Sequence, residues 1–162
     1  MTPFPQIIEE DYERITEALK EFLTLSEASN ALIVEKAGYL IVETGENPPF
    51  NTAELATLAA NAFNATQFMA DRLGESNFSS MFQQGDNSSV LWMNVEENSL
   101  LVVVFDASMS IGAVKYYAAE AAAAVAKQIA IAQERDASGG IDLAHLDPSS
   151  ADAVFKKKES DS

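Results

Sequence analysis

The sequence predicts an α+β fold: a five-stranded antiparallel sheet with helices on its faces, in the order α-β-β-α-β-β-β-α. Three segments repeat apolar residues at three- and four-residue steps, which is typical of amphipathic helices. Five short runs rich in β-branched and aromatic residues lie between these segments and are bounded by turn residues, as strands are. The chain of 162 residues, 48% of them hydrophobic, is long enough to bury a core. We therefore expect one α+β domain over residues 5–136.

The first helix is expected over residues 5–25. Its apolar positions follow the helical period and are Ile8, Tyr12, Ile15, Leu19, Phe22 and Leu23. The opposite face carries acids at Glu9, Glu10, Glu13, Glu17 and Glu21. A solvated face is the favoured interpretation, and a docking site for a basic partner is the alternative.

A β-hairpin is expected next, with strands at residues 31–35 and 39–43. Lys36-Ala37-Gly38 forms the turn between them, and Gly38 is expected to adopt a positive φ. Residues 45–49 contain glycine and two prolines, so they end the hairpin and begin a crossing loop.

The second helix is expected to begin after Asn51, an N-cap with Glu54 three residues later, and to run from there to Leu73 before Gly74. Its expected core stripe consists of Leu55, Leu58, Ala59, Ala62, Thr66, Met69 and Leu73.

The opposite face of this helix is unusual because it carries no charge between Glu54 and Asp71. The residues expected there are Ala56, Ala60, Asn64 and Phe68 at four-residue steps, with Thr57 and Asn61 beside them. Small residues and an aromatic ring allow another backbone to approach closely. This face is therefore predicted to be a subunit or partner interface, with burial on both sides inside one chain as the alternative.

Three further strands are expected at residues 78–83, 90–95 and 99–105, and the last, an unbroken apolar run, suits a central position in the sheet. A third helix should begin after Ser108 or Ser110 and stop near Gly139-Gly140. Its expected core stripe consists of Ile111, Val114, Ala118, Ala121, Val125, Ile129 and Ala132.

Residues 137–162 are expected to form a flexible C-terminal tail. Asp147 and Pro148 could start a short helix over residues 148–158, in which Val154 and Phe155 would be the apolar tip. A helix of this length is not stable alone in water. The tail is therefore either disordered or a motif that becomes ordered on a partner.

Composition and charge exclude most function classes. The chain has 25 acids, ten bases and a net charge of −15, which disfavours nucleic acids and anionic membranes. It has no Cys and one His, and it lacks a phosphate-binding glycine loop. The N-terminus has neither the basic nor the apolar region of a signal peptide. We therefore predict a cytoplasmic binding or regulatory module without catalytic, cofactor-binding or metal-ligating residues.

Several segments, in order, resemble the Roadblock/dynein-light-chain family in its bacterial form. The segments are residues 35–41, 55–66, 73–75 with Phe78, 84–85, 101–106 and 110–115, and the resemblance spans residues 8–135. It implies a profilin-like sandwich that forms a homodimer, with the second helices paired beside a continuous sheet. It also implies that the dimer binds a small Ras-like GTPase and stimulates its GTP hydrolysis, in cell polarity or motility.

By position, the resemblance assigns the GTPase contact to Ala56, Ala60, Asn64 and Phe68, although Phe68 is larger than the residues usual at its place. It assigns a second contact to Val154 and Phe155 of the tail. Two other functions fit the composition: an acidic secretion chaperone that holds an extended client, and a Roadblock scaffold without activating function.

Overall fold

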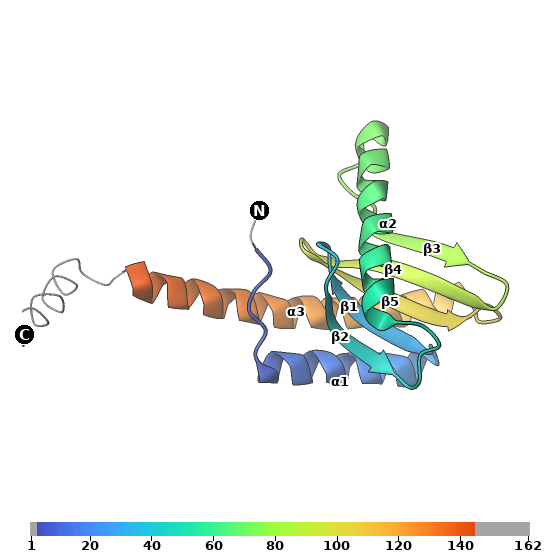
Figure 1. Cartoon of the computed structure of the whole chain (residues 1–162), viewed down its shortest axis with the longest axis horizontal. Helices are drawn as coiled ribbons and strands as arrows, with labels where there is room; N and C mark the ends of the chain where they lie inside the picture. The colour runs from blue at the N-terminus through green and yellow to red at the C-terminus, as the bar shows by residue number, and fades with distance from the viewer. Residues whose placement is uncertain (1–2, 145–162) are drawn as a thin grey trace, which may run out of the picture.

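The computed structural model describes residues 3–144 and contains three helices and five strands in the predicted order (Figure 1). They are α1 (Glu9–Ser26), β1 (Asn30–Glu35), β2 (Leu40–Gly45), α2 (Thr52–Leu73), β3 (Ser80–Gln84), β4 (Ser88–Glu96), β5 (Ser99–Asp106) and α3 (Ile111–Ala144). The predicted α+β class is confirmed. The proposed tail helix at 148–158, with Val154 and Phe155, lies outside the described residues.

All strand pairs in the sheet are antiparallel, and the spatial order is β2-β1-β5-β4-β3. β1 and β5 lie in the centre, so their side chains are covered on both faces, as the apolar run at 99–105 predicts. β2 and β3 are the two edges.

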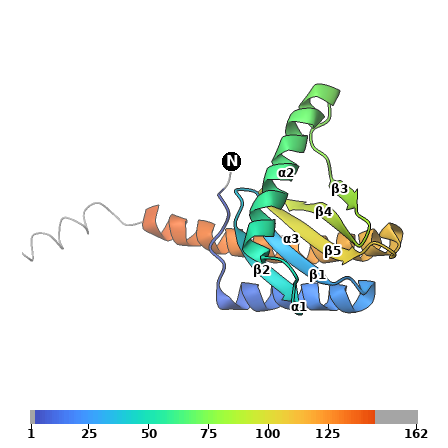
Figure 2. The same cartoon turned by 45° about the vertical axis from the view of Figure 1, so that its right-hand side comes forward.

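The helices lie on both faces of the sheet (Figures 1 and 2). α1 and α3 pack side by side on one face, and α2 crosses β1, β2 and β5 on the other. The core between the sheet and the α1–α3 layer includes Ile15, Leu19, Phe22, Ile33, Val42, Leu101, Val103, Phe105, Val114, Val125 and Ile129. A second, smaller core lies under α2 around Phe63.

The predicted turn and cap residues fix the ends of the elements. Gly38 has a φ of 109° in the β1–β2 turn, as expected. Asn51 Oδ1 accepts a hydrogen bond from Glu54 N at 2.9 Å at the start of α2. Gly74 ends α2 with a φ of 76°, a conformation that glycine adopts without strain.

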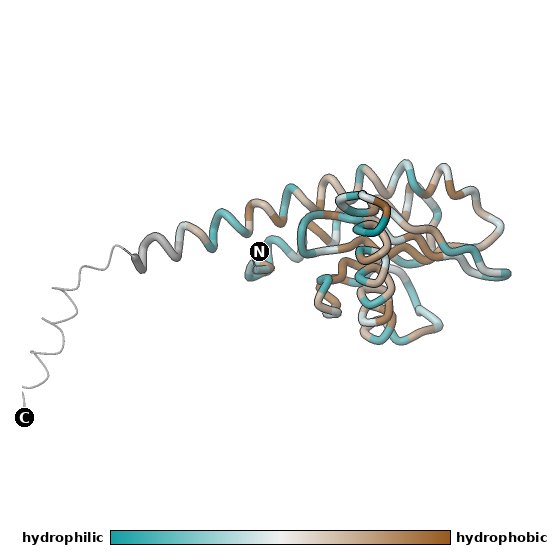
Figure 3. Tube along the Cα trace, turned by 90° about the horizontal axis from the view of Figure 1, so that it is seen from above, coloured by the Kyte–Doolittle hydropathy of each residue, from teal (hydrophilic) through white to brown (hydrophobic). Residues whose placement is uncertain are grey.

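The predicted end of the third helix at Gly139-Gly140 is wrong. α3 continues through both glycines to Ala144 and extends away from the sheet as a long arm (Figure 3). A glycine ends a helix where the chain turns into the left-handed conformation, whereas inside a helix it costs only about 1 kcal/mol relative to alanine. The alanine-rich segment that precedes the glycines favours continuation.

Candidate partner-binding surface

The inner face of α2 differs from the predicted one. The buried residues of this helix are Ala56, Ala59, Ala60, Phe63 and Ala70. Ala56 and Ala60, expected to face a partner, are fully buried against the sheet. Alanines allow the helix axis to approach the strands closely, and Phe63 fills the space that remains. The assignment of Ala56 and Ala60 to an exposed face was therefore wrong.

Of the predicted core stripe of α2, Ala59 is buried and Leu55 and Thr66 are partly buried, but the other four residues are exposed. Leu58, Met69 and Leu73 have exposed fractions of 57%, 59% and 69%. With Ala62 and Ala65, also exposed, they form what we call the apolar stripe. At 100° per residue these five positions lie along one side of the helix. An apolar row of this kind on a free helix suits contact with another protein.

The other side of α2 is attached to the β1–β2 turn by two hydrogen bonds. Thr57 Oγ1 donates to Gly38 O at 2.9 Å, and Asn64 Nδ2 donates to Lys36 O at 2.9 Å. The Lys36 ammonium lies 5.3 Å from the centroid of the Phe63 ring. The predicted interface residue Asn64 is thus half-buried, and its amide holds the turn in place.

Two predicted interface residues, Asn61 and Phe68, face solvent. Phe68 is 70% exposed, one of the highest values for a large apolar side chain here. Asn61 and Phe68 lie between the apolar stripe and the flank that contacts the turn, and Arg72 lies one turn beyond Phe68. Of the predicted set, Asn61 and Phe68 are therefore the two that a partner can reach without displacing α2.

The sheet offers a second unpaired surface next to α2. α2 crosses β1, β2 and β5, so the β3–β4 end of the same face extends beyond the helix (Figure 1). β3 pairs only with β4, and Met81 of this edge strand packs, half-buried, against the core under α2, whereas Phe82 stacks on Phe105 on the opposite face. Within the described residues the buried Trp92 Nε1, on β4, lacks a hydrogen-bond partner. An edge strand beside an exposed apolar helix is a template for association.

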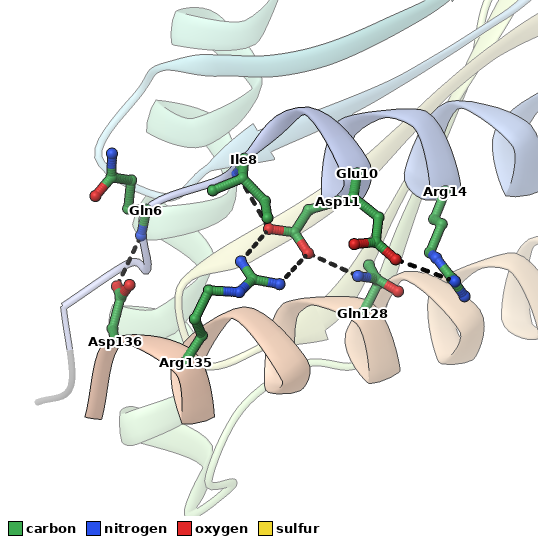
Figure 4. Close-up of polar contacts among 8 residues, drawn as sticks. All are labelled: Gln6, Ile8, Glu10, Asp11, Arg14, Gln128, Arg135 and Asp136. Carbon is green, nitrogen blue, oxygen red and sulfur yellow. Dashed lines mark hydrogen bonds and ion pairs between the residues drawn. The ribbon is translucent and has the colours of Figure 1, made fainter. Parts of the chain in front are cut away.

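A buried polar cluster connects α1 to α3 on the opposite face (Figure 4). Asp11 is fully buried, and its carboxylate accepts hydrogen bonds from Arg135 at 2.7 and 3.1 Å and from Gln128 Nε2 at 2.7 Å. It also accepts one from Ile8 N at 3.0 Å, which caps α1. The Arg135 guanidinium is the main reason that the pKa of Asp11 falls to about 2, against the opposing effect of burial. We call this cluster the Asp11 clamp.

The Asp11 clamp was not predicted, although the sequence contains a signal for it. Asp11 lies four residues before Ile15 on the buried side of α1, and Arg135 lies three residues after Ala132 on the buried side of α3. An acid and a base in register on two apolar stripes indicate a buried pair. The N-terminal segment adds a further tie, since Gln6 N donates to Asp136 Oδ2 at 2.8 Å.

The described residues contain no cluster of three or more His, Asp or Glu side chains placed to hold a metal ion. No helix in the part of the chain that the structure describes is long and apolar enough to cross a membrane.

The fold belongs to the class of α+β sandwiches in which a single helix covers one face of an antiparallel sheet. Acanthamoeba castellanii profilin IA has this architecture, with a TM-score of 0.50 and 18% identity over 70% of this chain and 97% of that one. The chain belongs to the Roadblock/LC7 family, because the family model of the Roadblock/LC7 domain matches residues 14–105.

Within this family the chain is similar to solved structures of MglB. A structure described as MglB with tetrameric arrangement has 32% identity and a TM-score of 0.75 over 82% of this chain and 99% of that one. The gliding protein MglB of Thermus thermophilus has 31% identity and a TM-score of 0.73 over 83% and 99%. Myxococcus xanthus MglB has 28% identity and a TM-score of 0.70 over 75% and 92%. No curated protein matches the chain.

Proposed function

We propose that this protein is a homodimeric cytoplasmic regulator that binds a small Ras-like, MglA-like GTPase and stimulates its GTP hydrolysis, in bacterial cell polarity or motility. The observation that carries the proposal is the uncharged outer surface of α2 on an MglB-like fold. The protein has a net charge of −15, yet α2 carries no charge between Glu54 and Asp71. A long uncharged helix surface on so acidic a protein indicates a place where a partner excludes water.

The apolar stripe and the β3 edge support self-association. Full burial of a Leu or Met side chain contributes roughly 1.5–3 kcal/mol, and a twofold interface counts each residue twice. Leu58, Met69 and Leu73 therefore offer enough apolar surface to hold a dimer. A second copy would also pair the free edge of β3 and extend the sheet.

The arginines of the described chain favour activation by conformational selection. Transfer of the γ-phosphoryl group to water needs an oriented water and positive charge on the phosphate. Arg135 holds Asp11, and Arg14 pairs with Glu10 at 3.2 Å on the α1 layer. That leaves Arg72, at the end of α2, as a candidate to act in trans. We propose instead that the dimer binds the hydrolysis-competent state of the GTPase most tightly, so that the catalytic residues are those of the GTPase.

The decisive experiment is single-turnover GTP hydrolysis by the MglA-like GTPase of the same genome, with and without this protein, together with a binding measurement. Binding with faster hydrolysis supports the activator, and binding with unchanged hydrolysis would leave a scaffold. Absence of binding would refute both. Arg72→Ala should bind and stimulate like the wild type, and loss of stimulation with binding retained would instead assign Arg72 a direct role.

Two variants of α2 separate the proposed surfaces. Met69→Glu should shift the dimer to monomer in analytical ultracentrifugation, because it places a charge in the apolar stripe. Phe68→Glu should leave the dimer intact and weaken GTPase binding at least tenfold. An unchanged affinity would remove Phe68 from the GTPase contact.

The chaperone alternative is weaker, because such chaperones usually have three strands after the first helix, whereas this fold has two.

A further inference from the structure

A pocket of about 660 Å³ lies beside the flank of α2 that contacts the β1–β2 turn. The N-terminal segment forms one wall with Phe4, α2 forms another with Asn64 and Gln67, and the two hairpin turns complete it with Lys36 and Glu97. It adjoins the outer surface of α2, because Asn64 and Phe68 are one helical turn apart.

The floor of this pocket is held in a fixed shape. Lys36 N donates to Asn98 O at 2.8 Å, which ties the β1–β2 turn to the β4–β5 turn. Lys36 O accepts the hydrogen bond from Asn64 Nδ2, which ties both turns to α2. Three separate segments thus meet at the backbone of Lys36, and a pocket built on such ties loses little freedom when it binds.

Two hydrogen-bond donors, the Gln67 amide and the Lys36 ammonium, line this pocket. Gln67 Nε2 is buried and has no partner among the residues that the structure describes. The Lys36 ammonium contacts the Phe63 ring, and no carboxylate of the described chain lies within 4.0 Å of it. Burial lowers the pKa of Lys36, and the charges of Glu96 and Glu97 partly offset this. Buried donors are normally satisfied, so the Gln67 amide favours an acceptor from outside. The Lys36 ammonium is half-buried and has no carboxylate in contact among the described residues, so it favours an anion at the same place.

We propose that this pocket receives a carboxylate side chain of the partner GTPase, held by the Lys36 ammonium and the Gln67 amide. This rests on the proposed function and adds the chemistry by which the partner is recognised. Gln67 follows Phe63 by four residues and Asn64 by three, so the donors border the same turn of α2. A carboxylate accepts from an ammonium and an amide at once and forms strong, charge-assisted bonds.

The rest of the lining narrows the class of ligand. Glu35 and Glu97 also line the pocket, so its formal charge is −1 when Lys36 is protonated. A free polyanion such as phosphate would be repelled, whereas a single carboxylate with a basic neighbour on the partner surface would meet both signs of charge. The ligand is therefore a singly charged carboxylate, and on the partner a basic residue beside it would strengthen binding by facing Glu35 and Glu97.

The first test uses acetate as the probe and needs no partner. In ¹⁵N spectra of the full-length protein, acetate should shift the side-chain amide signal of Gln67 in a saturable way, assigned with Gln67→Leu. Chloride and phosphate at equal ionic strength should not do so, and Lys36→Met should abolish the acetate effect. An unmoved Gln67 signal, or equal shifts with chloride, would overturn the proposal.

The second test uses the GTPase. Lys36→Met should weaken its binding at least tenfold, Lys36→Arg should weaken it less, and Lys20→Met, which removes an exposed lysine of α1, should leave it unchanged. Wild-type affinity in folded Lys36→Met would overturn the pocket proposal while the proposed function stands. If the wild type does not bind the GTPase, the proposed function fails, and the acetate test still decides whether the pocket binds carboxylates.

Discussion

Replacement of Asp11 by asparagine tests the reasoning about the buried cluster between α1 and α3. The variant keeps the shape of the side chain and one acceptor for Ile8 N, but it removes the negative charge that Arg135 and Gln128 surround. The NH₂ group of the asparagine would also face the N–H donors of Arg135 or Gln128. Because removal of one partner leaves the other charge with poor compensation, such changes cost more than an exposed ion pair contributes.

The size of the expected loss of stability follows from the pKa of Asp11. A fall from 3.8 to about 2 corresponds to about 2.5 kcal/mol of folding free energy, since one pKa unit equals about 1.4 kcal/mol. The folded-state pKa is the lower one, so this contribution is fully present above pH 3.8 and is lost as the pH falls through about 2. Asp11→Asn should therefore destabilise the protein by about 2.5 kcal/mol at pH 7 and by much less near pH 2.

The assay is urea unfolding of both proteins at equal concentration at pH 7, 4, 3 and 2, because a dimer has a concentration-dependent stability. Glu10→Gln is the matched control. Glu10 precedes Asp11 and pairs with Arg14 at 3.2 Å, but both side chains are more than 60% exposed, so its loss should cost less than about 0.5 kcal/mol. A loss below about 0.5 kcal/mol for Asp11→Asn at pH 7, or one that does not shrink toward pH 2, would refute the argument.

Four further substitutions test the backbone conformation at two glycines and the orientation of α2. Gly45→Ala should destabilise the fold by more than about 2 kcal/mol in urea unfolding, because Gly45 has a φ of 112° and an added Cβ would lie 2.5 Å from Ser29 O. Gly74 has a φ of 76° but open space around it, so Gly74→Ala should destabilise the fold by only about 1 kcal/mol. Equal losses of stability in the two glycine variants would contradict the steric explanation for Gly45. Ala60→Arg should unfold the protein or lower its melting temperature by more than 10 °C, whereas Ala65→Arg at an exposed position should not, as thermal unfolding will show.

Much of the fold could be predicted because its signals are local. Asn51 and Gly74 mark the ends of α2 through side-chain capping and a positive φ, and both depend on residues within four positions. The core stripe of α3 was predictable for the same reason, since its residues Val114, Val125 and Ile129 follow the helical period and are all buried. The continuation of α3 beyond Gly139 could not be predicted, because a glycine is compatible both with the end of a helix and with its interior.

The orientation of α2 could not be predicted from hydrophobicity because the helix is apolar on two sides. A hydropathy ranking places Leu58, Met69 and Leu73 inside, yet the sheet is covered by alanines around Phe63. Close approach of a helix to a sheet favours small residues with one large side chain to fill the gap. The larger apolar residues then remain outside. Because only one side of α2 is buried in the monomer, its other apolar side stays exposed. Burial of that exposed side against another subunit would stabilise a dimer. The same misassigned residues are therefore those on which dimer formation should depend, while GTPase affinity should depend on Phe68 and the Lys36 pocket.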